Sequence, residues 1–378
     1  MSAIEVCGIA KECLTKRFPD TNIETAPLTD GGEGFVEILT NHVGGSIYKH
    51  AVQRPHFGGS DEHHAAMWGM VNGHNLGEHT KKILDLPRHC KQLAIVEMAQ
   101  ASGLETLPPE KRNPWHTTSY GTGELIQEAV DQGADSVLMG IGGSATNDLG
   151  VGALQALGMQ FYDSNGHHIQ YPLSPVKWEQ VDTMVPSEQL EPLPVRIACD
   201  VSNPLLGTNG STSIYGPQKG LPLHEVSPME SAIHRMARKM CDSSGAGLET
   251  LETPGAGAAG GIGCGFLISG GASLIPGFEL IESWLQLRTK ITNADWILTG
   301  EGCVDESSLS GKGPVSILKR ADNHTRKTLI AGQVTLTSDQ ISMLGIDDLV
   351  LLVNENKTLS ENLKAAPVEL AEKLETLY

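Results

Sequence analysis

Hydrophobic positions along this chain recur with two different periods. Apolar residues at helical spacing predict helices over residues 4–18, 35–42, 122–132, 151–157, 228–242, 278–287 and 361–377. Short apolar runs bounded by turn residues predict strands over residues 22–28, 65–70, 93–98, 136–139, 195–199, 296–298, 328–331 and 348–353. Because strands and helices alternate, the pattern predicts an α/β protein with parallel strands, whose ligands bind at the carboxyl ends of those strands.

The stretch from Met139 to Gly158 carries the clearest chemical signal. It runs from a predicted strand through a glycine-rich turn into a predicted helix. Backbone N–H groups at such a turn face outward and bind anions, usually phosphate. The polar residues of the turn either cap the helix or hold a ligand hydroxyl or a metal-bound water. The turn contains Gly140, Gly142, Gly143, Ser144, Thr146, Asn147 and Asp148.

Four further turns are rich in small residues, and three of them also contain a carboxylate, two of these with a lysine. They span residues 30–34, 200–219, 255–261 and 300–312. Each alone is usually only a turn. Together they supply what phosphoryl transfer needs, because N–H groups hold phosphates, carboxylates hold magnesium or take a proton, and lysines neutralise charge. The candidate carboxylates are Asp30, Asp200 and Asp305, and the candidate phosphate-binding lysines are Lys219 and Lys312.

Composition narrows the class of protein. A chain of 378 residues with 39% hydrophobic and 19% charged residues is typical of a globular protein with two domains. A formal net charge of −18 argues against nucleic acid and anionic membranes as partners, and favours small molecules, including anions handled as magnesium complexes. The sequence contains no apolar run of eighteen residues and no signal pattern. Seven dispersed cysteines predict reduced thiols in a cytoplasmic protein.

Three competing motifs carry less weight. Six histidines lie between residues 56 and 89 without the spacing of metal ligands, so we expect a solvated loop region there. Residues 255–260 fit GxGxxG, but a proline and a polar segment precede them, which makes a poor first strand for dinucleotide binding. The absence of GxxxxGK[ST] and GxSxG from the sequence argues against a Walker-type kinase and an α/β-hydrolase.

Seven motifs, in order along nearly the whole chain, resemble the bacterial glycerate kinase family. They are DGGEG (30–34), EMAQASGL (97–104), GIGGSATND (140–148), ACDVSNPLLG (198–207), YGPQKG (215–220), PGAGAAGG (254–261) and TGEGCVDESSLSGK (299–312). The resemblance implies ATP-dependent phosphorylation of D-glycerate with Mg²⁺, at the 2-hydroxyl rather than the 3-hydroxyl. It also implies two α/β domains with a cleft between them. A Rossmann-like domain would comprise residues 1–52 and 287–378, and a larger, flavodoxin-like inserted domain residues 53–286.

The resemblance also suggests roles for residues of these turns. Asp200 or Asp305 would take the hydroxyl proton, and the other would face Mg²⁺ together with Asp30 or Glu33. Lys219 and Lys312 would complete the catalytic set. ATP would lie across residues 140–144 and 255–261, and the glycerate carboxylate would meet a lysine and backbone N–H groups. The residues expected to contact substrate or nucleotide are Asp30, Glu33, Gly142, Gly143, Ser144, Asn147, Asp148, Asn203, Gly257, Gly260 and Glu301.

The chain departs from the family pattern in four places. It begins at the first helix, where the family has a preceding strand and an Asp- and Lys-bearing turn. Tyr120 and Cys303 stand where the family has arginines, and neither can bind a carboxylate in the bidentate way that arginine does. Leu149 replaces a glycine, so its side chain must point away from any bound ligand. These departures favour a second hypothesis, an impaired or altered-substrate paralogue that binds a small hydroxy acid, such as tartronate, or a nucleotide. Homo-oligomerisation is left open.

Overall fold

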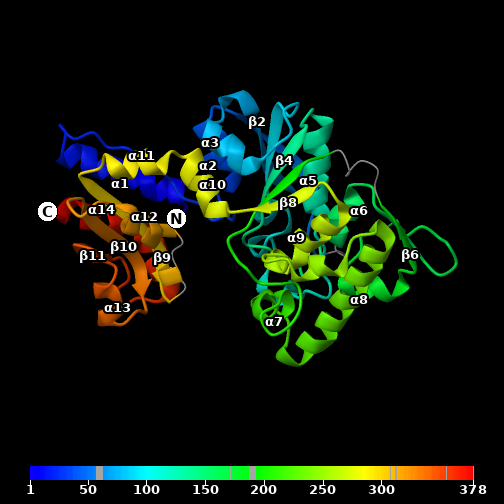
Figure 1. Ribbon diagram of the computed structural model, residues 1–378. Coiled ribbons are helices and arrows are strands. Elements are labelled where there is room, and N and C mark those ends of the chain that lie inside the picture. The colour runs from blue at the N-terminus through cyan, green and yellow to red at the C-terminus, as the bar shows by residue number, and fades with distance from the viewer. Residues whose placement is uncertain are drawn as a thin grey trace. The chain divides into compact units, whose positions relative to one another are not determined.

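The computed structural model describes residues 1–56, 63–170, 172–186, 193–306, 308–310, 313–354 and 356–377 (Figure 1). The chain divides into two compact units. The smaller unit contains Met1–Thr29 and Ile281–Tyr378, and the larger contains Asp30–Leu280. Both combine helices with a sheet, so the predicted α/β class is confirmed.

The larger unit is built on a six-stranded sheet in the order β1-β2-β3-β4-β7-β8. Its strands are β1 (Ser46–Gln53), β2 (His63–Asn72), β3 (Gln92–Glu97), β4 (Ser136–Gly140), β7 (Val195–Ala198) and β8 (Ala272–Ile275). The pairs β1–β2 and β2–β3 are antiparallel, whereas β3, β4, β7 and β8 are parallel to one another. Strands β3 and β4 are almost entirely buried, as expected for parallel strands covered on both faces. The carboxyl ends of the four parallel strands therefore form one edge.

Helices cover this sheet and supply its core. Ala94 and Val96 of β3 share a hydrophobic core with Leu125 and Ile126, which lie on one face of α5. Helix α2 contacts β1, β2 and β3. The helices of this unit are α2 (Phe35–His42), α3 (Glu78–Leu84), α4 (Met98–Ser102), α5 (Tyr120–Asp131), α6 (Val151–Ala156), α7 (Ser211–Tyr215), α8 (Val226–Ser244) and α9 (Ala258–Ser269), and α10 (Gly277–Trp284) spans the boundary. A small separate sheet pairs β5 (Gln160–Tyr162) with β6 (Thr183–Val185).

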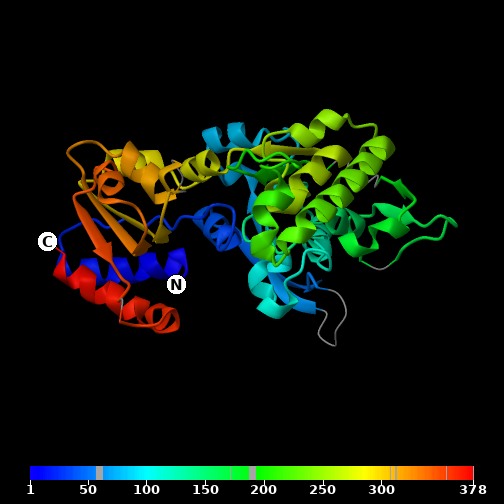
Figure 2. The same ribbon diagram turned by 90° about the horizontal axis from the view of Figure 1, so that it is seen from below.

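The smaller unit holds a three-stranded parallel sheet in the order β11-β10-β9. Alternate residues of the central strand face different cores. Leu329 and Ala331 pack with Val315 and Leu318, whereas Ile330 packs with Leu370 and its neighbours. The strands are β9 (Trp296–Val304), β10 (Arg326–Val334) and β11 (Asp348–Leu351), and the helices are α1 (Ala3–Arg17), α11 (Leu287–Thr292), α12 (Gly313–Arg320), α13 (Ser338–Ser342) and α14 (Leu359–Thr376). Helices α1 and α14 lie side by side (Figure 2).

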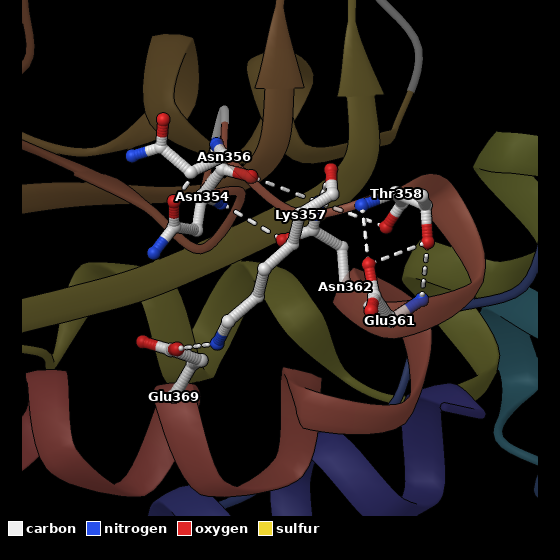
Figure 3. Close-up of polar contacts among 7 residues, drawn as sticks. All are labelled: Asn354, Asn356, Lys357, Thr358, Glu361, Asn362 and Glu369. Carbon is white, nitrogen blue, oxygen red and sulfur yellow. Dashed lines mark hydrogen bonds and ion pairs between the residues drawn. The ribbon is translucent and has the colours of Figure 1, made fainter.

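The turn before α14 is closed by its own polar side chains (Figure 3). Thr358 and Glu361 form a reciprocal capping box at the start of the helix. The Asn362 side-chain amide donates to the carbonyls of Asn354, Lys357 and Thr358. Because these groups satisfy one another, we interpret the cluster as a helix cap and not as a ligand site.

Most of the predicted elements are present, and the exceptions have physical causes. Residues 22–28, predicted as a strand, form no ladder, because a strand requires a neighbouring strand. Instead the segment contacts other elements, with Glu24 paired to Lys290 at 3.9 Å. Within the histidine-rich segment, expected to be a solvated loop region apart from the strand predicted over 65–70, that strand is present as β2, and residues 78–84 form helix α3. No group of three potential metal ligands occurs among the described residues.

Residues 30–52 join the larger unit, although the sequence analysis placed them with the chain ends. The reason is that β1 pairs with β2 along its full length and extends the large sheet. Across the described ranges, no helix is long and apolar enough to cross a membrane. All seven cysteines lie in these ranges, and none forms a disulfide there.

Candidate functional site

Two glycine loops meet at the carboxyl edge of the large sheet. We call residues 30–34 the first glycine loop and residues 140–148 the second. The Gly142 N–H donates to the Gly31 carbonyl at 2.9 Å. A Cβ atom on Gly140 would lie 2.5 Å from the Gly31 carbonyl oxygen, and one on Gly142 would lie 2.7 Å from the Gly32 nitrogen. Glycine is therefore required in the second loop because the first loop leaves no room for a side chain.

The second glycine loop presents two adjacent backbone amides. Gly143 has φ +68° and is exposed at the surface. The preceding amide, of Gly142, and the following amide, of Ala145, donate to the carbonyls of Gly31 and Ser102, and the Gly143 carbonyl between the two amides accepts from Leu104 N–H. The N–H groups of Gly143 and Ser144 donate to no acceptor within the described part of the chain. Two neighbouring unoccupied N–H groups at a left-handed turn form an anion-binding concavity.

Lys219 supports this loop from inside the protein. Its side chain is 1% exposed, and its Nζ donates to Ser144 Oγ at 2.7 Å and to the Thr146 carbonyl at 2.6 Å. Burial lowers the pKa of Lys219 to about 7, against the opposing effect of the Asp148 charge. The structure thus brings together Lys219 and Ser144, which the sequence analysis singled out in separate motifs.

Asp148 and Asn147 are also buried and brace the loop. The Asp148 carboxylate accepts from the Ser119 N–H at 2.7 Å and from the Ser119 hydroxyl at 2.8 Å. Burial raises the pKa of Asp148, although these bonds oppose the shift. The Asn147 side chain bonds to the hydroxyls of Ser211 and Thr212, each at 3.0 Å. Both residues therefore hold the backbone of the loop in place.

A left-handed turn at the start of α9 packs against the same loop. Ala259, Gly260 and Gly261 have φ angles of 52°, 77° and 84°. A Cβ atom on Gly260 would lie 2.1 Å from the Thr146 carbonyl oxygen, and the Leu149 N–H donates to the Gly260 carbonyl at 2.9 Å. Leu149 itself has φ +54°, a conformation that favours glycine, and its side chain is fully buried in the core. The leucine therefore points away from the loop surface.

Asp200 and Asn203 follow β7 along the same edge. One Asp200 carboxylate oxygen accepts from the Phe278 N–H at 3.0 Å, near the start of α10. The Asn203 side-chain carbonyl accepts from the Tyr215 hydroxyl at 2.7 Å, and the Asn203 backbone carbonyl accepts from the Gly257 N–H at 2.9 Å. The structure thus joins Asn203 to Gly257, whereas the carboxylate of Asp200 bonds to a different segment.

The remaining candidates are exposed or belong to the smaller unit. Asp30 accepts from the Gly32 N–H at 3.2 Å, and the Glu33 side chain is exposed. Glu301 lies in β9, and burial, assisted by the charge of Asp305, raises its pKa. The Asp305 N–H donates to Ser308 Oγ at 3.2 Å. Lys312 lies outside the described residues.

Sequence reasoning did not select Glu97, the last residue of β3. Its side chain is 1% exposed, and Oε2 accepts from the Val36 N–H at 3.3 Å. Burial raises the pKa of Glu97 to about 7. The available signal was a carboxylate directly after a buried apolar run, which is the same signal that selected Asp200.

The parallel strands and the amide pair at their carboxyl edge define an α/β protein with a candidate ligand site at that edge. The chain belongs to the glycerate kinase family, whose model matches residues 1–378. A glycerate kinase from Haemophilus influenzae is 36% identical over 366 residues, which cover 96% of this chain and 91% of the relative. A glycerate 2-kinase from Escherichia coli is 34% identical, with 97% and 91% covered.

A solved structure shares the fold. It is described as "putative glycerate kinase 2" from Salmonella typhimurium LT2, and it superposes with a TM-score of 0.73 at 32% identity. The match covers 99% of this chain and 93% of that chain.

Proposed function

We propose that this protein is a glycerate kinase that transfers the γ-phosphoryl group of ATP to the 2-hydroxyl of D-glycerate. Membership of the family over the whole chain supports the reaction, and the name of the Escherichia coli relative supports the 2-position. The observation that carries the proposal is the unoccupied amide pair of Gly143 and Ser144, supported by the buried Lys219. Such a fixed pair of donors stabilises negative charge on a phosphoryl or carboxylate group without reorganising.

The carboxylates and the remaining loops have proposed roles in the same reaction. Asp200 or Asp305 accepts the hydroxyl proton of glycerate, and the other, with Asp30 or Glu33, provides oxygen ligands of the kind Mg²⁺ prefers. Bound Mg²⁺ would neutralise charge on the phosphates of ATP. ATP lies across the second glycine loop and residues 255–261. Lys312 belongs to the proposed catalytic set and Glu301 to the proposed binding residues, and we propose that the smaller unit is a Rossmann-like domain.

A direct assay tests the proposal. Purified protein with ATP, Mg²⁺ and D-glycerate should release ADP and form 2-phosphoglycerate, identified by ³¹P NMR. Asp200→Asn serves as the control for contaminating kinases. Failure of the wild-type protein to form phosphoglycerate above that control would overturn the proposal, and formation of the 3-isomer would correct the position.

The second candidate function is an altered-substrate paralogue. It is favoured by Tyr120 and Cys303, which stand where the family has arginines. Tyr120 is half-buried, and burial raises its pKa, so it remains a neutral side chain at physiological pH. A panel of hydroxy acids that includes tartronate distinguishes the two functions, because the paralogue would prefer another acid or would bind glycerate in calorimetry without turnover.

A further inference from the structure

Glu97 lies between the two glycine loops. Strand β3 ends at Glu97 and pairs in register with Gly140, the last residue of β4. Its backbone is therefore adjacent to the start of the second glycine loop. Its side chain accepts from Val36 in the first turn of α2, two residues after Gly34, the last residue of the first glycine loop.

The Glu97 side chain caps a helix that does not cap itself. Helix α2 starts after Gly34, and no side chain in its described N-terminal segment accepts from the first-turn amides. The first four N–H groups of a helix need acceptors from elsewhere, and a carboxylate at this end also interacts favourably with the helix dipole. The bond from Val36 to Glu97 joins residues 61 positions apart in the sequence. Glu97 thus fixes the start of α2 to the large sheet.

The start of α2 determines where the first glycine loop lies. That loop directly precedes the helix, and it contacts the second loop through the bond between Gly142 N–H and Gly31 O. Movement of α2 away from β3 would therefore draw Gly31 away from Gly142. The amides of Gly143 and Ser144 follow immediately along the chain.

Retaining a carboxyl group at this position is costly. Glu97 Oε1 is buried and has no hydrogen bond of standard geometry within the ranges that the structure describes, although the nearby Gln100 side chain opposes the rise in the pKa of Glu97. A buried polar atom without a partner destabilises the folded state, so its presence in a native protein needs an explanation. A requirement to hold the two loops in register provides one.

We propose that Glu97 is a positioning residue that caps α2, holds the first glycine loop against the second, and thereby orients the Gly143 and Ser144 amides toward an anionic ligand. For the identity of that ligand the inference rests on the proposed function. The geometric part, that Glu97 controls the contact between the loops, does not depend on catalysis.

Kinetic comparison of three variants tests this role. Glu97→Ala removes the cap, and a loop displaced by about 1 Å should lower kcat/KM about 10- to 100-fold. We expect KM for ATP to rise, which a smaller folded fraction alone would not cause. Glu97→Gln should restore most of the loss, because its amide oxygen still accepts the Val36 N–H. Asp135→Ala is the matched control, since that carboxylate accepts from Lys91 and Gln92 N–H at the opposite end of the same two strands. It should leave KM unchanged.

Hydrogen exchange provides a second readout that needs no activity. The Gly142 amide should exchange faster in Glu97→Ala, recover in Glu97→Gln, and stay protected in Asp135→Ala. If the alanine variant does not fold, Glu97→Asp serves instead, because it withdraws the carboxylate by one methylene. Unchanged KM together with unchanged Gly142 exchange in either variant would overturn the inference. If the wild-type protein had no glycerate kinase activity, only the proposed function would be overturned. The exchange of the Gly142 amide would still decide whether Glu97 positions the loops.

Discussion

The two edges of the six-stranded sheet hold their loops in different ways. At the amino edge, partly exposed side chains bind the backbone of neighbouring segments. Asp135 accepts from the Lys91 N–H at 2.7 Å, and Arg196 donates to the carbonyls of Leu84 and Asp85, each at 2.6 Å. Water can replace such bonds when the side chain is removed, so each contributes about 1 kcal/mol.

At the carboxyl edge, the loops are held in place by buried side chains and by direct contacts between backbone atoms. Lys219, Asp148 and Glu97 are each 1% exposed or less, and glycines allow the loops to touch without intervening side chains. The result is a braced surface on which the amides of Gly143 and Ser144 have no acceptor within the described residues. The comparison indicates that stability at this edge is exchanged for a fixed arrangement of donors, as expected of a preorganised site.

Gly140→Ala should break this arrangement with the largest effect. The added Cβ would lie 2.5 Å from the Gly31 carbonyl oxygen and 2.7 Å from the Phe35 ring. Overpacking of this kind costs about 1–3 kcal/mol of folding free energy. Because the glycine loops separate, kcat/KM for glycerate phosphorylation should fall about 100-fold. Denaturant unfolding and steady-state kinetics measure both effects.

Gly133→Ala is the matched control at the amino edge. Gly133 has φ +96°, and a Cβ atom added there would meet no atom of a non-adjacent residue within 4 Å, so alanine strains the backbone without a collision. We expect a cost of about 1 kcal/mol in stability and unchanged kinetics. Equal activity losses in the two variants would contradict the difference between the edges.

Lys219→Met should have the next largest effect. It removes the donor to Ser144 and Thr146, so we expect kcat/KM to fall about tenfold. It should also change the pH dependence of stability. The pKa of Lys219 is about 7 in the folded protein and about 10.5 when unperturbed, so the unfolded chain binds more protons between these values. Wild-type stability relative to the variant should therefore rise with pH across this window, by at most about 4–5 kcal/mol.

Lys239→Met is the matched control for this prediction. Lys239 is an exposed lysine of α8 whose Nζ donates to the Val181 carbonyl. Its replacement should alter neither kcat/KM nor the pH dependence of unfolding, both measured beside Lys219→Met. A flat difference in stability between wild type and Lys219→Met from pH 7 to 10 would contradict a buried lysine of lowered pKa.

The contrast between the edges was only partly predictable from sequence. Buried parallel strands are visible as apolar runs, and glycine turns after them are visible as composition, so the α/β class and the second glycine loop followed from local pattern. The prediction of a strand over residues 22–28 was wrong, because strand formation depends on a neighbouring strand, which the local sequence pattern does not reveal.

The support of the site depends on contacts far apart in the chain. Lys219 meets Ser144 across 75 positions, and Glu97 meets Val36 across 61. From sequence alone, a lysine in a tight turn is expected to be exposed. The fold buries Lys219 because Ser144 and Thr146 accept hydrogen bonds from it. The sequence predicts that Leu149 points away from the loop. Its left-handed backbone conformation was not predictable, because leucine rarely adopts a positive φ.

Arg196→Met should have the smallest effect on activity and thereby delimit the site. Arg196 donates to two carbonyls at the end of α3, and its loss should cost about 1–2 kcal/mol because each of these partly exposed hydrogen bonds contributes about 1 kcal/mol. These contacts are at the amino edge, so kcat and KM should remain within about twofold of wild type, since stability and catalysis are separable at distant sites. Kinetics measured well below the unfolding temperature test this. A rise in KM comparable with that of Glu97→Ala would contradict this prediction. It would mean that contacts at both edges of the sheet affect ligand binding, and not only the buried contacts at the carboxyl edge.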